Sequence, residues 1–239
     1  MLVTNFNFKY FIYKIILSVY QVIDLGIHHP VRERARRALH KTVDYIESNL
    51  PEAMGFETQK ELTVYALREV RVEGEYIECG VFSGGTIRFI AKNIKDKIIH
   101  GFDSFEGLPE EWHGFILGKN AFSRGGRLPK VPQNVILHKG WFKDTLPKWS
   151  EQNSKPICFL HIDCDLYSST KEIFNVLGRH FREGTVILFD EYFNYPNWEN
   201  HEYKAWQEFV QGKNVKYHYL GYARQQVAIV IDSIGVRRK

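Results

Sequence analysis

The stretch Ile157-Cys-Phe-Leu-His-Ile-Asp163-Cys-Asp165 is a mostly apolar run that ends in two carboxylates, and Val186-Ile-Leu-Phe-Asp190-Glu191-Tyr192 repeats this pattern one helix length later. Such short apolar runs are typical of strands buried on both faces of a parallel sheet. The carboxyl ends of neighbouring parallel strands open into one crevice, where ligands bind. Acids gathered there repel one another and lose hydration, and a hard cation offsets this cost. The two runs therefore predict a metal site inside an enzyme.

Strands and helices alternate along the chain around these two runs. Strands are expected at residues 75–79, 98–102, 135–138, 157–162, 185–189, 215–220 and 226–231. Helices are expected at residues 84–94, 142–152, 168–181 and 199–210. The alternation predicts an α/β fold with a mainly parallel sheet and right-handed crossovers. Only the turn 221–225 separates the last two strands, so they are expected to form an antiparallel hairpin.

The first 72 residues show no strand pattern and are expected to form a helical extension or lid of a domain that spans residues 73–239. The run 8–27 is rich in Phe, Tyr, Ile and Leu, but Lys9, Lys14 and Asp24 interrupt it, so it falls short of the roughly 20 apolar residues of a spanning helix. No signal-peptide cleavage site follows. We expect this helix to pack on the domain or on a second subunit, giving a homo-oligomer, with shallow membrane association as the less favoured alternative.

Composition argues against two classes of protein. The formal net charge of +4 is too small to indicate nucleic-acid binding. The three cysteines, Cys79, Cys158 and Cys164, have no paired spacing, which is typical of buried reduced thiols in a cytoplasmic protein. A zinc site is not expected, because no Cys-x-x-Cys or His-Glu-x-x-His motif occurs.

A glycine-rich loop, Glu78-Cys-Gly80-Val-Phe-Ser83-Gly84, follows the first predicted strand. Asp103 ends the next strand 23 residues after Gly80, where a fixed carboxylate can accept both hydroxyls of a ribose. The loop lacks the G-x-G-x-x-G spacing of a pyrophosphate site and carries a carboxylate ahead of its first glycine. A cofactor with a cationic amino-acid part fits it better, which favours S-adenosylmethionine. The alternative is a structural turn with a half-buried Glu78.

Two aromatic features of the chain have both a functional and a structural interpretation. Gly140 and Trp141 follow the third strand, where the indole either stacks on an adenine or belongs to the core. The long connection 104–134 contains Trp112 and Phe122, and loops of this length usually serve a function. We expect it to act as a lid over the acceptor.

The acids at the strand ends also have a structural alternative, because acidic residues often cap helix N-termini. Asp163, Asp190 and Glu191 are the candidates for metal ligands. Asp165 stands directly before Leu166-Tyr-Ser-Ser-Thr170, the start of a predicted helix. It is therefore the acid that we expect to cap a helix.

Five motifs occur in an order that resembles a known family: Ile77-Glu-Cys-Gly-Val-Phe-Ser-Gly-Gly85, Gly101-Phe-Asp-Ser-Phe-Glu-Gly-Leu-Pro109, Lys139-Gly-Trp-Phe-Lys-Asp-Thr-Leu-Pro147, His161-Ile-Asp-Cys-Asp-Leu-Tyr-Ser-Ser-Thr170 and Phe189-Asp-Glu-Tyr192. Together they are similar to the macrocin O-methyltransferase family of class I, S-adenosylmethionine-dependent enzymes, over residues 52–232. The resemblance implies a seven-stranded Rossmann-like sheet with a reversed last strand. It also implies magnesium and methylation of a sugar hydroxyl on a natural product.

The resemblance assigns roles to individual residues. Those implied to contact the cofactor are Glu78, Gly80, Ser83 and Gly84 at the methionine part, Asp103 at the ribose, and Met54 near the cofactor and acceptor. Further candidates for cofactor contact are Ser104, Gly140, Trp141 and Asp163. Those implied to hold the metal are Asp163, Asp190 and Glu191. Many family members carry Asp-Asp-Tyr where this chain has Asp190-Glu191-Tyr192, and the longer Glu side chain shifts the expected metal position.

The expected reaction is methyl transfer from S-adenosylmethionine to a hydroxyl of a sugar, polyol or catechol-like small molecule, with magnesium lowering the pKa of that hydroxyl. His138, Asp165 and Asp190 are candidates for the base. The rival interpretations are a metal-dependent glycosyltransferase using Asp163-Cys-Asp165, a nicotinamide-dependent oxidoreductase and a non-catalytic methyltransferase homologue. The expected partner is a hydroxylated small molecule, not a nucleic acid or a membrane.

Overall fold

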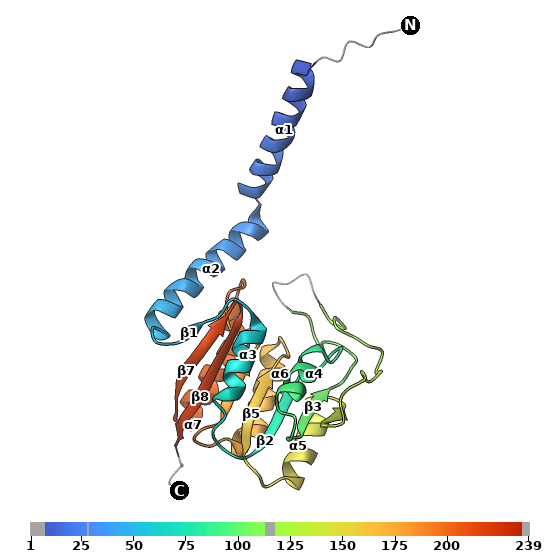
Figure 1. The fold of residues 1–239 in the computed structure, drawn as a ribbon, viewed down its shortest axis with the longest axis vertical. Coiled ribbons are helices and arrows are strands. Elements are labelled where there is room, and N and C mark those ends of the chain that lie inside the picture. Colours follow the sequence, from blue (N-terminus) through green and yellow to red (C-terminus); the bar gives the residue numbers. More distant parts are fainter. Residues whose placement is uncertain (1–7, 28, 113–117, 236–239) are drawn as a thin grey trace.

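The centre of the fold is a set of five parallel strands in the spatial order β4-β3-β2-β5-β6 (Figure 1). The computed structural model describes residues 8–27, 29–112 and 118–235. The five strands are Glu75–Cys79 (β2), Ile99–Asp103 (β3), Val135–Lys139 (β4), Ile157–Ile162 (β5) and Val186–Phe189 (β6). Every residue of β5 and β6 is buried, as apolar runs between two helical layers require. The two acid-tipped runs are therefore parallel neighbours, as predicted.

Antiparallel and edge strands complete the sheet on the β6 side. Val215–Ala223 (β7) and Gln226–Ile234 (β8) form the predicted hairpin, and β8 pairs antiparallel with β6. An eighth strand, Met54–Gly55 (β1), pairs in parallel with β7. The prediction of seven strands and of an all-helical N-terminal extension is therefore wrong at this point, because two residues are too few to show a strand alternation.

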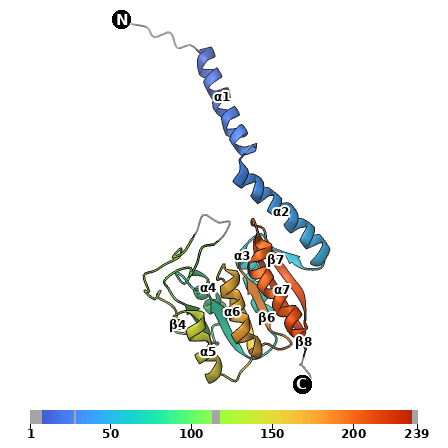
Figure 2. The ribbon, with the colours of Figure 1, turned by 180° about the vertical axis from the view of Figure 1, so that it is seen from behind.

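Helices cover both faces of the sheet. Phe142–Gln152 (α5), Tyr167–Leu177 (α6) and Glu202–Lys213 (α7) pack around one core cluster, with α7 in front in Figure 2. Gln59–Arg68 (α3) and Gly85–Asn93 (α4) pack around the other, with α3 in front in Figure 1. Two short 3-10 helices, Gly178–His180 and Trp198–Asn200, also belong to the domain. Cys79, Cys158 and Cys164 are buried free thiols, as predicted.

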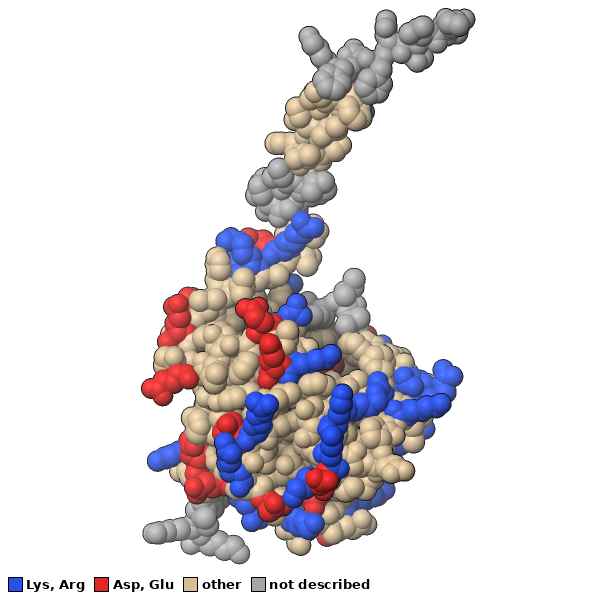
Figure 3. Space-filling model, in the orientation of Figure 1, with Lys and Arg blue, Asp and Glu red and all other residues tan. Residues whose placement is uncertain are grey.

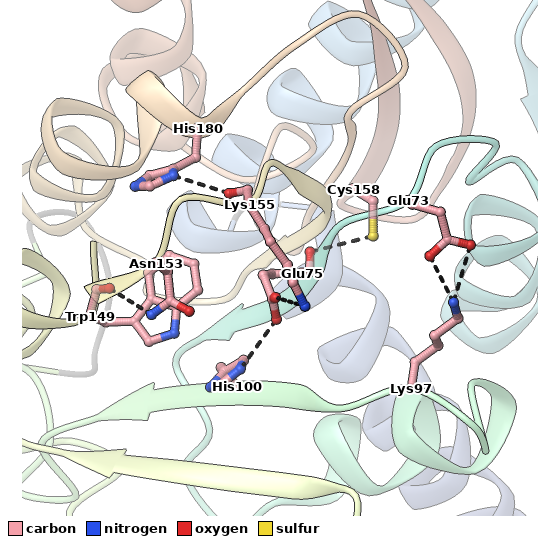
Figure 4. Close-up of polar contacts among 9 residues, drawn as sticks. All are labelled: Glu73, Glu75, Lys97, His100, Trp149, Asn153, Lys155, Cys158 and His180. Carbon is pink, nitrogen blue, oxygen red and sulfur yellow. Dashed lines mark hydrogen bonds and ion pairs between the residues drawn. The ribbon is translucent and has the colours of Figure 1, made fainter. Parts of the chain in front are cut away.

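A polar cluster joins the strands near their amino ends (Figure 4). The Glu75 carboxylate, at the start of β2, lies 3.3 Å from Lys155 Nζ and 3.4 Å from His100 Nε2. Lys97 Nζ lies 2.8 Å from a carboxylate oxygen of Glu73. None of these residues belongs to the predicted site, which lies at the opposite, carboxyl edge of the same strands.

Two N-terminal helices, Phe8–Ile27 (α1) and Pro30–Asn49 (α2), precede the domain and contact it differently. α2 packs on it through Tyr45, whose hydroxyl lies 2.6 Å from that of Tyr219 and whose ring lies edge-on to Trp198. α1 projects away from the domain (Figures 1 and 2), and the side chains of residues 11–20 are all exposed. The expected packing of this helix on the domain is therefore not observed. Among the described helices, none has the length and apolar character needed to cross a membrane.

Candidate functional site

A cavity of about 600 Å³ opens at the carboxyl ends of the parallel strands. It lies beside β2, which is flanked by β3 on one side and β5 on the other, at the point where the strand order reverses. Open α/β sheets bind their ligands at such points. The predicted residues that line it are Gly80, Asp103, Ser104, Trp141, Asp163, Asp165, Asp190 and Glu191. The fold thus brings together residues that come from the ends of five different strands.

The other predicted residues do not line the cavity: Met54, Glu78, Ser83, Gly84, His138 and Gly140. Gly84 is the N-cap residue of α4, and Gly140 donates its N–H to the carbonyl oxygen of Asp103 at 3.0 Å. Met54 is half exposed on β1, which is the edge strand at the far end of the sheet from β4. The structure therefore does not bring Met54 to the cavity.

His138 also lies away from the cavity, although the sequence made it a candidate base. Its ring stacks on Phe102 with centroids 4.4 Å apart, and its Nε2 lies 2.9 Å from His100 Nδ1. Burial, with His100 nearby, lowers the pKa of His138 to about 4. The His138 ring therefore lies against His100 and Phe102 of β3 and outside the cavity lining, which argues against a role as the base.

The glycine loop is held by the residue predicted to bind the ribose. Asp103 Oδ2 accepts hydrogen bonds from the N–H groups of Val81 (2.8 Å) and Phe82 (2.7 Å), and Oδ1 accepts one from Phe105 (2.6 Å). Gly80 has a φ of +95°, and a Cβ there would lie 1.5 Å from the carbonyl oxygen of Asp163. Only glycine therefore fits where the loop passes between β3 and β5.

Glu78 is fully buried behind this loop and contacts a residue that the sequence analysis did not select. Register pairs it with His161 on β5, whose Nδ1 lies 3.2 Å from Glu78 Oε2. His161 Nε2 lies 3.6 Å from Asp190 Oδ1. The one available signal was a lone histidine in an apolar run, two residues before Asp163 and so on the same side of the strand.

A candidate metal centre follows from these contacts. His161, Asp163 and Asp190 each offer a ligand atom, and these atoms lie within 4.8 Å of one another. Glu191, predicted as a ligand, is not in this group, but its Oε2 is buried without a hydrogen-bond partner among the described residues. Its backbone N–H donates to Oε2 of Glu202 at 3.2 Å. Crowded carboxylates with an unsatisfied oxygen suit a divalent cation.

The crowding and burial of these acids shift their pKa values. Burial and the nearby Asp190 hold the pKa of Asp163 well above its usual range, and the same causes raise the pKa of Asp165 to about 7. Burial also holds the pKa of Glu191 well above its usual range. Asp190 is the exception: burial raises its pKa, but the contacts with His161, Gln226 and Glu191 together outweigh burial and lower it. Bound protons or a bound cation would therefore stabilise the cluster.

These shifts predict how the stability of the metal-free protein depends on pH. A carboxyl whose pKa is raised by folding contributes stability below its unfolded pKa and loses it as pH rises through the folded pKa. The stability that Asp165 contributes therefore falls as pH rises from about 4 to its folded pKa of about 7, and it stays low above that pH. We expect the melting temperature in chelator to be lower at about pH 8 than at about pH 6.

Magnesium should reverse this loss, because it binds deprotonated carboxylates. It should raise the melting temperature more at the higher pH, with potassium chloride of equal ionic strength as the control. A melting temperature in chelator that is the same at both pH values would contradict the prediction.

Asp165 does not cap a helix, contrary to expectation. The N-cap residue of α6 is Leu166, and no side chain accepts a capping hydrogen bond there. Asp165 instead has a φ of +64°, which Asp tolerates better than most residues, and it is buried in the cavity wall beside Asp163. This leaves it as a candidate base.

The long connection 104–134 contributes to the cavity in part. Phe122 lines it and lies edge-on to Phe82 of the glycine loop, with centroids 5.6 Å apart. Glu110 accepts a hydrogen bond from the Ser168 hydroxyl at 2.5 Å. Trp112, which we expected in the lid, is 4% exposed and packs in the core. Residues 113–117 lie outside the described residues.

Residues 77–192 match a family described as a methyltransferase domain. Demethyldecarbamoylnovobiocin O-methyltransferase of Streptomyces niveus is 27% identical over 150 residues, 52% of this chain and 55% of that protein. 8-Demethyl-8-(2,3-dimethoxy-alpha-L-rhamnosyl)-tetracenomycin-C 4'-O-methyltransferase of Streptomyces olivaceus is 28% identical over 149 residues, 51% and 54% of the two chains. The chain thus spans about half the length of the curated relatives it matches.

The solved structure of CalS11, a calicheamicin methyltransferase, superimposes with a TM-score of 0.58 at 20% identity. The match covers 84% of this chain and 93% of that chain. At this identity the likeness concerns the fold. It confirms the predicted Rossmann-like architecture with antiparallel C-terminal strands.

Proposed function

We propose that this chain is an S-adenosylmethionine-dependent O-methyltransferase that methylates a hydroxyl of a sugar or other polyhydroxylated small molecule with the help of magnesium. The observation that carries the proposal is that the glycine loop with Asp103 and the acids Asp163 and Asp190 line one cavity. Relatives named as O-methyltransferases support it, as does the resemblance to the macrocin O-methyltransferase family.

The cofactor would be held at the β2 and β3 side of the cavity. We assign the backbone around Gly80, which lines the cavity, to the methionine part. The resemblance also implies Glu78 there, but this side chain is fully buried against His161 and does not line the cavity, so we assign it no direct contact with the cofactor. Asp103 and Ser104 are assigned to the ribose, and Trp141 to the adenine.

The acceptor would lie on the other side, next to the acids. When bound, S-adenosylmethionine would supply the methyl group and magnesium would lower the pKa of the acceptor hydroxyl. Asp163 and Asp190 would hold the ion, with Glu191 and His161 as further candidate ligands. Phe82 and Phe122 would exclude water at the rim of the cavity.

Asp165 is the side chain that we assign to accept the proton of the acceptor hydroxyl. It lines the cavity beside Asp163, and a pKa of about 7 matches the needs of a base near neutral pH. Asp165→Asn should lower kcat by roughly 100-fold or more while the affinity for S-adenosylhomocysteine stays unchanged.

Initial rates on an acceptor found by screening hydroxylated compounds with labelled cofactor would measure the effect of Asp165→Asn. Asp232→Asn, at an exposed acid on β8, is the control with the same change in charge. An unchanged kcat in Asp165→Asn would assign the base elsewhere.

Calorimetry separates the proposal from its rivals. Titration with S-adenosylhomocysteine should give heat, whereas a nucleoside diphosphate with magnesium should not. The reverse result would support the glycosyltransferase interpretation of Asp163-Cys-Asp165. Cofactor binding without turnover of any acceptor, with and without magnesium, would indicate a non-catalytic homologue.

A further inference from the structure

The exposed helix α1 has an apolar face that the described part of the domain does not cover. Ile12, Ile15, Ile16 and Val19 recur at the spacing of one helix face, and each is 40–61% exposed. Ser18 lies at the margin of this stripe, about 110° around the helix from its middle. The helix is therefore amphipathic, with a broad apolar stripe open to solvent.

A basic cluster follows this helix in the sequence. The first turns of α2 carry Arg32, Arg34, Arg36 and Arg37, and the only acid among them is Glu33. Residues 8–41 hold seven Lys and Arg against two Asp and Glu, a net charge of +5, whereas the whole chain carries +4. The rest of the chain is therefore close to neutral. Figure 3 shows the basic side chains over the start of α2, next to α1.

Two more features of these helices suit a boundary between an apolar phase and water. Tyr13 and Tyr20 of α1 are 58% and 65% exposed, and tyrosines favour the boundary between apolar and aqueous phases. Val31, Leu39 and Val43 are exposed on α2, so the apolar surface continues beyond the first helix.

We propose that α1 and the start of α2 form a docking surface for an anionic lipid bilayer. The apolar face of α1 enters the boundary between headgroups and acyl chains, with the helix in the plane of the membrane, and the arginines of α2 contact lipid phosphates. Charge decides between this occupant and a second copy of the chain. Two copies would bring +5 against +5, whereas an anionic surface complements it. This inference does not depend on the proposed enzymatic function.

Co-sedimentation of the full chain with vesicles tests the proposal. We expect binding to vesicles of phosphatidylcholine with one quarter phosphatidylglycerol, much weaker binding to pure phosphatidylcholine, and a loss of binding as salt is raised. No binding to the anionic vesicles, or equal binding to both kinds, overturns the proposal.

Matched variants locate the surface. Ile15→Asp should abolish binding, whereas Ser18→Asp adds the same charge at the margin of the stripe and should weaken binding much less. Arg32→Gln with Arg34→Gln should weaken binding by roughly 25-fold, about fivefold for each arginine, whereas Lys213→Gln with Lys216→Gln, at exposed positions near the junction of α7 and β7, should not. Equal effects within either pair of variants overturn the proposal.

Light scattering in solution tests the competing occupant. We expect a monomer in both the natural chain and Ile15→Asp. A dimer that Ile15→Asp converts to a monomer, in a chain that does not bind vesicles, would assign the apolar face to a second copy instead. Circular dichroism and thermal melting confirm that each variant remains folded.

Discussion

Asp163→Asn is expected to lower methyl transfer by about 100-fold or more and to remove the gain in melting temperature caused by magnesium. Asp163 lines the cavity and belongs to the group of ligand atoms with His161 and Asp190. An amide of the same shape cannot supply the charge that the ion requires. The loss should therefore appear as weaker metal binding.

The same substitution should make the metal-free protein more stable at about pH 8. Burial and Asp190 raise the pKa of Asp163, so ionising it in the folded protein costs free energy, and the neutral amide avoids that cost. Loss of activity together with a gain in metal-free stability is a signature that general misfolding cannot produce. Asp232→Asn is the control, since this acid is exposed. Full activity of Asp163→Asn in the presence of chelator would refute the metal centre.

Gly80→Ala is expected to have the largest effect on stability. The added Cβ would lie 1.5 Å from the Asp163 carbonyl oxygen, and the φ of +95° is strained for any L side chain. The backbone at both residues is held in place by hydrogen bonds, because Gly80 N–H donates to Phe102 O and Asp163 N–H donates to Cys79 O, both at 2.9 Å. We expect a loss of about 4 kcal/mol or more in the free energy of unfolding.

Thermal melting measures this change, with an expected decrease of roughly 10 °C or more for a chain of this size. Gly85→Ala is the matched control. Gly85 begins α4, and a Cβ there meets no atom within 4 Å, so the change should be neutral or slightly stabilising. Equal melting temperatures for the two variants would contradict the close approach between the loop and β5.

The strands and much of the cavity could be predicted because their signals are local. Apolar runs, short turns and glycines show in the sequence itself, and acids at strand ends must meet at the carboxyl edge of a parallel sheet. The edge strand β1 could not be predicted, because its two residues pair with β7 by tertiary contact alone. Trp112 could not be assigned either, since a tryptophan in a long loop can face a cavity or the core.

The positions of the acids could be predicted from the sequence, but the residues that they contact could not. The sequence alone predicted that Asp163, Asp190 and Glu191 stand at the carboxyl ends of strands, because each apolar run ends in these acids. The pairing of β5 with β6 makes those two strands neighbours. Only the fold decided that His161 joins them, since register pairs it with Glu78 and brings its Nε2 to 3.6 Å from Asp190. Only the fold showed that Asp165 lines the cavity instead of capping α6. A side chain's partner depends on register and backbone torsion, which the pattern of residue types does not contain.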